Sequence, residues 1–387
     1  MKNLNSYEES IQNIKGSKSK ALSADNLDMM KFLLCKANKI NFLGHHLEKE
    51  DSLFYEDVLY NRELACNDES YYSDVNKRTT LSGNIAALKD AKESPKIFCT
   101  FHMGSYRYIY YLLIKEKIDF SVIIDDKTLT TQGEILNSIY EEFKDVESPG
   151  YLKLLNAESS SIGIQMIREI KSGKCLLLYI DGNSGVGGMQ RNDEKLAQID
   201  FLGKKILARK GISYISYATK TPIVPVISVK ESESEFRTHF YDEITPSAII
   251  DKEKYCEDTT QFLYDTLAEV LLKYPEQWEG WLYVDRFLDL EALRSEKEQE
   301  TYSINEGTRL KFNQERFNSF QINDDIYLFD MHRYDYLKIS EKFKAYLSSL
   351  DSTPVFASDF NNEENGAILK KMFEKKIIVE NITEAVN

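Results

Sequence analysis

Residues 101–107 (FHMGSYR) place a histidine and a glycine-containing turn directly after a short apolar run. The run 96–101 is typical of a buried strand, so we expect His102 to leave the mouth of a sheet. An imidazole, with an ordinary pKa of about 6.5, suits general-base work. The amides that follow open a helix, where an anion or a developing oxyanion is favoured. The alternative role for His102 is to cap the turn.

A second polar position follows the apolar run 175–180, where Asp181 begins a loop rich in glycine, residues 182–188 (GNSGVGG). A carboxylate at this strand end is a candidate to orient His102 and to stabilise its charged form. The structural alternative is an Asx-turn that leads into a flexible loop. The loop lacks the Gly-Lys-Ser/Thr of a nucleotide-binding P-loop.

Four basic side chains fall within seven positions of an otherwise acidic chain: Lys204, Lys205, Arg209 and Lys210. They are candidates to hold the phosphates of a pantetheine-type acyl donor. A solvated basic surface is the alternative. The stretch 274–281 contains both tryptophans of the chain, and its composition indicates packing residues that close the domain.

Composition excludes several classes of protein. The net charge of −14 over 387 residues argues against binding to nucleic acid, which depends on neutralisation of phosphates, and against adhesion to an anionic membrane. No run approaches the roughly 20 apolar residues of a membrane-spanning helix, and the N-terminus lacks an apolar signal core. We therefore expect a soluble, cytoplasmic protein. The five cysteines have no C-x-x-C spacing, and we expect no metal site.

The elements that must position these residues alternate along the chain. Apolar strands are expected at 96–101, 120–124, 175–180 and 223–227, and helices at 106–117, 134–143, 160–171 and 210–219. Such alternation predicts an α/β fold with a mainly parallel sheet covered by helices on both faces. Functional residues should then lie at the carboxyl ends of the strands.

The chain as a whole is expected to have four parts: an N-terminal helical segment 1–95, the α/β domain 96–290, a linker 291–306, and a C-terminal domain 307–387. The linker is charged and has no apolar stripe. In the last part the pattern predicts a strand at 326–329, helices at 334–350 and 363–375, and a strand at 377–379. This order is typical of a small winged-helix-like α+β domain.

Taken in order, these segments resemble the bacterial lauroyl/myristoyl acyltransferases of lipid A synthesis, in the lysophospholipid acyltransferase superfamily. The resemblance covers about residues 95 to 288. Its carriers are His-x-Gly at 102–104, the strand and Asp loop at 176–188, Phe-x-Gly at 201–203, the Thr-Pro stretch 221–225, and Tyr-Pro-Glu-Gln-Trp at 274–278 followed by Trp281 and Arg286. The fold it implies is glycerolipid acyltransferase-like.

The resemblance implies an enzyme that moves an acyl group from a CoA or acyl-carrier-protein thioester to an amine or hydroxyl, with no bound cofactor. His102 would act as general base with Asp181 as its carboxylate. The remaining implied site residues are Gly104, Ser105 and Arg107 near the substrate or oxyanion, Lys204, Lys205, Arg209 and Lys210 at the donor phosphates, and Gly203 and Arg286 elsewhere in the pocket.

Two features depart from that family. Its members usually carry Asp or Glu where this chain has Arg107. Arginine cannot act as a base, and it lowers the pKa of a neighbouring histidine. Either Asp181 supplies the carboxylate, or Arg107 binds an acidic acceptor or donor, or the site is inactive; we favour the first two together. The N-terminal membrane anchor of the lipid A enzymes is also missing, which argues against a membrane-lipid acceptor.

The tail 307–387 resembles the PqqD-like peptide-recognition domains of ribosomal peptide biosynthesis. The carriers are 327–330 (YLFD), the helix around 346–347, and the closing segment 369–378. The resemblance implies that a leader peptide binds as an added β-strand at a sheet edge. A DNA-binding winged helix is the alternative, and the acidic surroundings count against it.

The leading hypothesis is thus an acyltransferase that acts on a peptide or small-molecule acceptor in the biosynthesis of peptide natural products. One alternative is a non-catalytic partner that holds a peptide or carrier protein on a degenerate acyltransferase fold. The other is a lipid acyltransferase. Arg107 separates the first two: the enzyme is favoured if Asp181 reaches His102 while Arg107 faces away.

Overall fold

The computed structural model of the chain describes residues 6–18, 26–44, 47–148, 150–182, 195–247, 250–295, 304–350, 353–362 and 365–381. The chain divides into two compact units. The first unit is Met1–Ala21 with His45–Leu288, and the second is Leu22–Gly44 with Asp289–Asn387. The expected N-terminal segment 1–95 is therefore not one part, because its residues 22–44 belong to the second unit.

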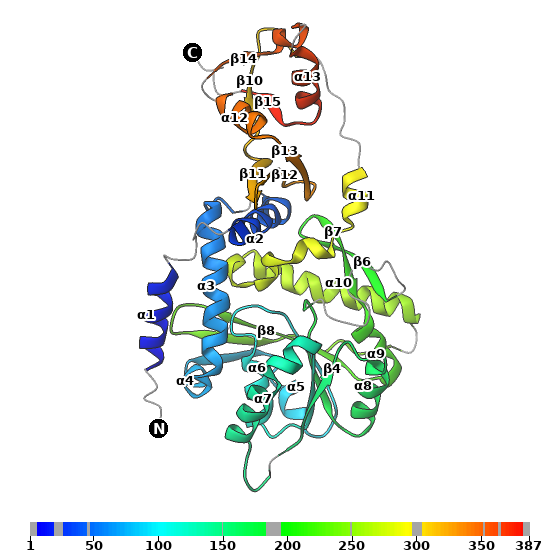
Figure 1. Ribbon diagram of the computed structural model, residues 1–387. Helices are drawn as coiled ribbons and strands as arrows, with labels where there is room; N and C mark the ends of the chain where they lie inside the picture. The colour runs from blue at the N-terminus through cyan, green and yellow to red at the C-terminus, as the bar shows by residue number, and fades with distance from the viewer. Residues whose placement is uncertain are drawn as a thin grey trace. The chain divides into compact units, whose positions relative to one another are not determined.

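Within the described residues, a seven-stranded sheet forms the centre of the first unit, in the order β1-β9-β8-β2-β5-β3-β4 (Figure 1). The strands are β1 (Thr79–Gly83), β2 (Ile97–Thr100), β3 (Phe120–Ile124), β4 (Leu152–Asn156), β5 (Cys175–Tyr179), β8 (Ile223–Lys230) and β9 (Phe236–Phe240). Five adjacent strands, from β8 to β4, run parallel, and only the pairing of β8 with β9 is antiparallel. The prediction of a mainly parallel sheet is confirmed.

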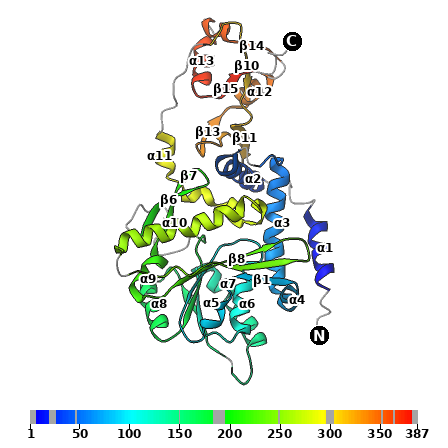
Figure 2. The same ribbon diagram turned by 180° about the vertical axis from the view of Figure 1, so that it is seen from behind.

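Helices cover both faces of this sheet. The first-unit helices are α1 (Tyr7–Lys18), α3 (Asp51–Glu69), α4 (Tyr72–Lys77), α5 (Ala86–Asp90), α6 (Tyr108–Lys115), α7 (Asp126–Phe143), α8 (Ile162–Lys171), α9 (Gly211–Thr219) and α10 (Lys252–Leu271). In both views α1, α3 and α4 lie toward one end of the sheet, and α8 and α9 toward the other (Figure 1, Figure 2). Residues of α6 and α7 pack on one face with Phe98, and α10 packs on the other face through Tyr264. The predicted covering of both faces is confirmed.

The central strands have unbroken apolar sequences because both faces of the sheet are buried. Alternate residues of a strand face opposite sides of the sheet, so both sets must be apolar when both faces are covered. Phe98, Val122 and Leu177 join one apolar cluster with residues of α6 and α7. The next residues along the chain face the other side, where the Phe101 ring packs against Tyr264 of α10 with ring centroids 5.7 Å apart.

Several strands were not predicted because they lie at the sheet edges or outside the sheet. β1 and β4 are the outermost strands, and their alternate positions are partly exposed, so they lack the continuous apolar pattern of a buried strand. The antiparallel hairpin of β6 (Leu196–Phe201) and β7 (Lys204–Arg209) was missed for the same reason. Three short 3-10 helices follow α10: η3 (Pro275–Gln277), η4 (Glu279–Leu282) and η5 (Val284–Phe287).

The second unit is a small α+β assembly with antiparallel sheets. Its described strands form the sheets β14-β10-β15 and β11-β12-β13. They are β10 (Arg309–Phe312), β11 (Phe317–Ile322), β12 (Asp325–Asp330), β13 (Asp335–Ile339), β14 (Val355–Phe356) and β15 (Ile378–Glu380). The helices are α2 (Asn26–Asn38), η1 (Lys39–Leu43), α11 (Leu290–Ser295), α12 (Glu341–Ser349), η6 (Ala357–Asn361) and α13 (Gly366–Glu374).

Two predictions for this unit need correction. The helix expected over 334–350 is in fact β13 followed by α12, because residues 335–339 pair with β12 in an antiparallel ladder. The linker expected over 291–306 contains α11, and its residues 296–303 lie outside the described part of the chain. Residues 22–44 belong here because Tyr334 donates a hydrogen bond to Asn38 (2.8 Å) and Asn41 donates one to the carbonyl of Met331 (2.7 Å).

Candidate active site

The site is set by the register of two neighbouring parallel strands. Thr100 at the end of β2 lies opposite Tyr179 at the end of β5. His102 and Asp181 each follow two residues later, so the chain brings both side chains to the same carboxyl edge. The structure therefore places together the two residues that were predicted as catalytic.

The buried carboxylate of Asp181 accepts hydrogen bonds from three groups. The Nδ1 of His102 lies 2.8 Å from its Oδ1, and the backbone amide of His102 donates to both oxygens at 3.1 and 3.0 Å. The indole Nε1 of Trp278 donates to its Oδ2 at 2.6 Å. Asp181 is 0% exposed. Because the carboxylate faces donors on all sides, Nδ1 carries the imidazole proton and Nε2 is left as the basic nitrogen.

Burial and three neighbouring residues determine the charge of His102. Burial disfavours the protonated ring, but the Asp181 charge, its hydrogen bond and the nearby Glu279 outweigh that effect. The pKa of His102 is consequently raised above its ordinary value, and Arg107 opposes the rise only weakly. A base with a raised pKa takes up a proton more readily in the transition state.

This balance predicts a pH effect for Glu279→Gln. In a reaction for which His102 is the general base, the imidazole must be unprotonated. Activity would then rise as pH increases through the pKa of His102, and the acidic limb of kcat/KM would report that pKa. Removing the Glu279 charge should move the midpoint of this limb to lower pH, because Glu279 raises the pKa. The measurement is a pH profile of wild type beside Glu279→Gln, with the exposed Glu235→Gln as matched control. A midpoint that stays in place, or moves to higher pH, would contradict this electrostatic role.

Arg107 does not displace Asp181 from the histidine. Its guanidinium pairs with Glu69 at 2.6 Å, donates to the hydroxyl of Tyr106 at 3.1 Å, and lies over the Tyr106 ring at 5.4 Å. Tyr106 and Tyr179 flank the imidazole, with ring centroids 4.8 and 5.3 Å from that of His102. Glu69 was not predicted, and it partly neutralises the arginine beside the base.

The turn after His102 is held by the segment that contains Trp278. The amide of Gly104 donates to the carbonyl of Gln277 at 2.9 Å, and the amide of Glu279 donates to the carbonyl of His102 at 2.9 Å. Gly104 has φ +55°, and a Cβ at this position would lie 2.3 Å from the carbonyl oxygen of Ser228. Only glycine fits this approach.

The predicted substrate or oxyanion role of Gly104 and Ser105 does not agree with their positions. Neither residue belongs to the cavity lining. Ser105 is buried, and its hydroxyl donates to Asp68 at 2.5 Å. The side chain turns inward because the buried carboxylate of Asp68 offers it an acceptor. Arg107 does line the cavity.

A cavity of about 1080 Å³ opens beside His102. Its apolar wall comes mainly from β3, α8 and α9, and includes Val122, Ile123, Ile124, Leu136, Ile162, Ile164, Met166, Ile167, Leu178, Ile212 and Ile215. Its polar lining near the histidine includes Glu69, Tyr106, Arg107, Tyr179, Glu279 and Tyr283. Such a volume is slightly above the range of about 300–1,000 Å³ typical of ligand pockets.

A basic group also lines the cavity. It contains Arg209 and Lys210, as predicted from the sequence, together with Lys195 and Lys252, which were not predicted. Lys210 pairs with Glu253 at 2.7 Å. Lys195 was missed because it is isolated from the basic cluster in sequence and joins it only through the β6–β7 hairpin, where the residue after it pairs with Arg209.

Four further predicted residues lie outside the cavity lining: Gly203, Lys204, Lys205 and Arg286. Lys205 is four residues before Arg209 on β7, about 13 Å away along a strand, and it pairs with Asp200 at 3.1 Å. Leu202 and Gly203 both have positive φ (+48° and +77°), so they form the two-residue turn of the hairpin. Arg286 is exposed.

Two further observations concern the described residues alone. No group of three or more His, Cys, Asp or Glu side chains there is arranged to hold a metal ion. In the same part of the chain no helix has the length and apolar character needed to cross a membrane. Residues 183–188 of the glycine-rich loop lie outside the described residues, so only Asp181 and Gly182 of that motif are placed.

The fold and site define a mixed α/β protein with a His–Asp pair at the carboxyl edge of a mainly parallel sheet. No protein-family model matches the chain, and no curated protein matches it. Among solved structures, the chain is similar to the 1-acyl-sn-glycerophosphate (LPA) acyltransferase, PlsC, from Thermotoga maritima. The two share 12% sequence identity with a TM-score of 0.31, over 62% of this chain and 95% of that chain. A likeness of this size does not define a function, whereas the side-chain geometry of the site constrains one.

Proposed function

We propose that the protein is an acyltransferase that moves an acyl group from a CoA or acyl-carrier-protein thioester to an amine or hydroxyl of an acceptor. The observation that carries the proposal is the hydrogen-bonded His102–Asp181 pair at the edge of an apolar cavity of about 1080 Å³. A base supported by a buried carboxylate suits proton removal from a weak nucleophile, and an apolar cavity suits an acyl chain.

The proposed reaction moves one proton and one acyl group, and His102 handles the proton. As the acceptor oxygen or nitrogen bonds to the thioester carbonyl carbon, Nε2 of His102 takes its proton. Asp181 stabilises the imidazolium that forms. The C–S bond then breaks, and the imidazolium returns the proton to the leaving thiolate. The products are the acylated acceptor and the free thiol, so atoms and charge balance without a cofactor.

The arrangement of Arg107 supports an enzyme over a non-catalytic binding protein. Asp181 contacts His102 directly, while Arg107 is engaged by Glu69 at 2.6 Å. Asp181 is therefore the carboxylate that supports His102. Arg107 lines the cavity, where it can contact a polar group of the substrate. The lipid-acceptor alternative has no observation that favours it beyond the apolar lining.

The decisive experiment is an acyl-transfer assay on the full chain. The purified protein is incubated with acyl-CoA or acyl-carrier-protein thioesters of several chain lengths and with a panel of peptide, amine and alcohol acceptors. We expect equal amounts of acylated acceptor and free thiol, measured by mass spectrometry and a thiol reagent. Failure of every donor and acceptor pair to react, together with retained binding of donor or peptide, would favour the non-catalytic alternative.

For the donor, we propose that Arg209, Lys210, Lys195 and Lys252 bind its phosphates. Lys210→Gln should then raise the KM for a CoA thioester by about 10-fold, since a hydrogen bond to a charged group contributes about that much. The value of kcat should stay close to that of wild type, because this contact is the same in the ground and transition states. Lys205→Gln, on the same hairpin but outside the cavity lining, is the matched control. Equal effects of the two changes on KM would indicate a general effect of net charge.

One observation favours a peptide-binding role for the second unit. Strand β13 pairs with β12 on one side only within the described residues, and it exposes Tyr336 (62%) and Leu337 (53%). An edge strand with free backbone groups accepts an added strand. We propose that a leader peptide of the acceptor docks there. Loss of peptide affinity after deletion of residues 307–387 is expected, and unchanged affinity would contradict this role.

A further inference from the structure

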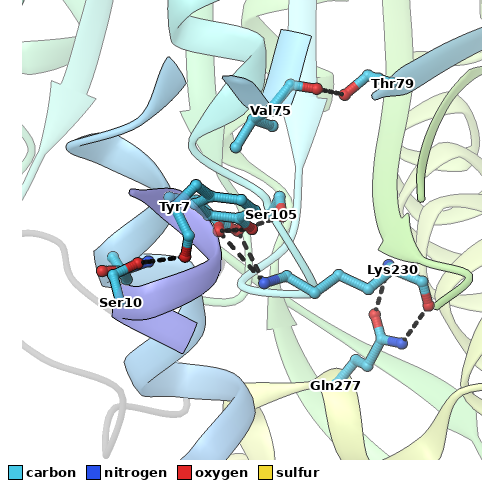
Figure 3. Close-up of polar contacts among 9 residues, drawn as sticks. Tyr7, Ser10, Val75, Thr79, Ser105, Lys230 and Gln277 are labelled. Carbon is cyan, nitrogen blue, oxygen red and sulfur yellow. Dashed lines mark hydrogen bonds and ion pairs between the residues drawn. The ribbon is translucent and has the colours of Figure 1, made fainter. Parts of the chain in front are cut away.

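A buried polar network lies behind the turn that carries His102, and it is separate from the cavity lining. At its centre is Asp68 in the last turn of α3, which is 2% exposed. Asp68 accepts hydrogen bonds from the hydroxyls of Tyr7 (2.8 Å) and Ser105 (2.5 Å), and its carboxylate pairs with the Nζ of Lys230 at 3.1 Å. Figure 3 shows Tyr7, Ser105 and Lys230 converging on one point from three different elements.

The network contains one buried ion pair, between the ammonium of Lys230 and the carboxylate of Asp68. The side chains of Lys230 and Asp68 are only 6% and 3% exposed. Burial lowers the pKa of Lys230, and the Asp68 charge and hydrogen bond work against that effect. A buried charge is tolerated only when it is paired and hydrogen-bonded. The ammonium and carboxylate therefore hold each other in place, and the carboxylate in turn fixes the Ser105 hydroxyl.

The same lysine is connected to the turn through its backbone. Gln277 accepts from the amide of Lys230 at 2.9 Å and donates to its carbonyl at 2.7 Å (Figure 3). The carbonyl of Gln277 accepts from the amide of Gly104. The turn 102–105 is thus held on one side by Gln277 of η3, which is bonded to Lys230 at the end of β8, and on the other by Asp68 of α3.

We propose that Ser105, Asp68 and Lys230 are positioning residues for His102, a role that rests on the proposed acyl transfer. They touch neither the cavity nor the imidazole. They act by fixing the turn between His102 and α6, so that Nδ1 stays aligned with Asp181 and Nε2 stays presented to the acceptor. Tyr7 extends this support to α1, so the first helix of the described chain takes part in holding the base.

A purely structural network is the competing explanation, and the control must separate the two. Lys96 offers a matched comparison, because it is also buried (7% exposed) and paired with a carboxylate, Glu243, at 2.8 Å. It lies just before β2, whereas His102 lies just after it. Loss of either lysine should reduce stability, but only the loss of Lys230 should disturb the base.

The test compares Ser105→Ala, Lys230→Met, Lys230→Arg and Lys96→Met in the full chain. Melting temperature, kcat, donor KM and the acidic midpoint of the pH profile are measured. We expect Ser105→Ala and Lys230→Met to lower kcat by about 10- to 100-fold, since small misplacement of a catalytic group costs up to about that much. The donor KM should stay unchanged, the midpoint should move to lower pH as the contact with Asp181 weakens, and Lys230→Arg should recover most of kcat. Lys96→Met should lower the melting temperature alone.

Folded Ser105→Ala and Lys230→Met with wild-type kcat and pH midpoint would overturn the proposal, as would an equal loss of kcat in Lys96→Met. If Lys230→Met fails to fold, Ser105→Ala decides the question, because it removes one hydroxyl and leaves the ion pair intact. If the wild type transfers no acyl group, the proposed function fails. The positioning role is then read from an NMR titration of the His102 imidazole, which needs no substrate: an unchanged pKa in Ser105→Ala overturns it, and a lowered pKa supports it.

Discussion

Replacement of His102 by alanine is expected to lower the rate of acyl transfer by a factor of about 10² to 10⁴, the usual contribution of a general base. The imidazole is the basic group that the sheet register brings to Asp181, and its Nε2 is the nitrogen left free to take the acceptor proton. The loss should appear in kcat, because the apolar cavity that holds the acyl chain stays intact. The measurement is the steady-state rate of thiol release in the presence of acceptor.

The matched control for this change is His239→Ala. His239 lies on β9, contacts Ser82 through its Nδ1 at 2.9 Å and does not line the cavity, so its loss tests for a general effect of removing a half-buried imidazole. Wild-type rates in His239→Ala and a large loss in His102→Ala would support the assignment. Equal rates for His102→Ala and wild type would remove His102 from the reaction.

Much of the candidate site could be predicted because it depends on local pattern. His102 and Asp181 each follow an apolar run, and in a parallel sheet the ends of such runs meet at one edge. What local pattern does not contain is the strand order. β2 pairs with β5 and β8, whereas the next strand in the chain, β3, lies beyond β5. It is the pairing of Thr100 with Tyr179 that turns two plausible residues into a hydrogen-bonded pair.

The residues that sequence reasoning missed act across long separations. Trp278 was interpreted as a packing residue, and it is fully buried, yet its indole also donates to Asp181. Glu279 follows it and reaches the cavity because its amide is bonded to the carbonyl of His102. Nothing in the spacing of these residues indicates that the chain returns to the histidine turn, since the return is made where the short 3-10 helices η3 and η4 meet, at residues 277–279.

For Ser105 the error was of another kind. The side chain was predicted to face the substrate, whereas it points into the protein and bonds to Asp68. A hydroxyl next to a catalytic histidine suggests a role toward substrate. Its orientation is decided by Asp68, 37 residues earlier in the chain, which is buried and already paired with Lys230. A buried carboxylate gains more from another donor than a solvated cavity wall does, so the hydroxyl turns inward.

Asp181→Asn is expected to lower kcat by a similar factor, about 10² to 10⁴. All three groups that contact this carboxylate are donors: the amide and Nδ1 of His102 and the indole of Trp278. An asparagine amide supplies only one acceptor oxygen, so its NH₂ group must face one of these donors. The least costly relief is transfer of the imidazole proton from Nδ1 to Nε2, which lets Nδ1 accept and removes the base from the acceptor side.

The same change should alter the pH profile in a direction that a loss of folding does not mimic. Asp181 raises the pKa of His102, so Asp181→Asn should move the acidic midpoint to lower pH while the remaining rate stays low. Asp200→Asn, at an exposed carboxylate on β6 that pairs with Lys205, is the matched control and should leave both rate and midpoint unchanged. Retention of kcat within about 10-fold of wild type in Asp181→Asn would show that the carboxylate only supports the fold, because a base in the wrong tautomer costs far more than that.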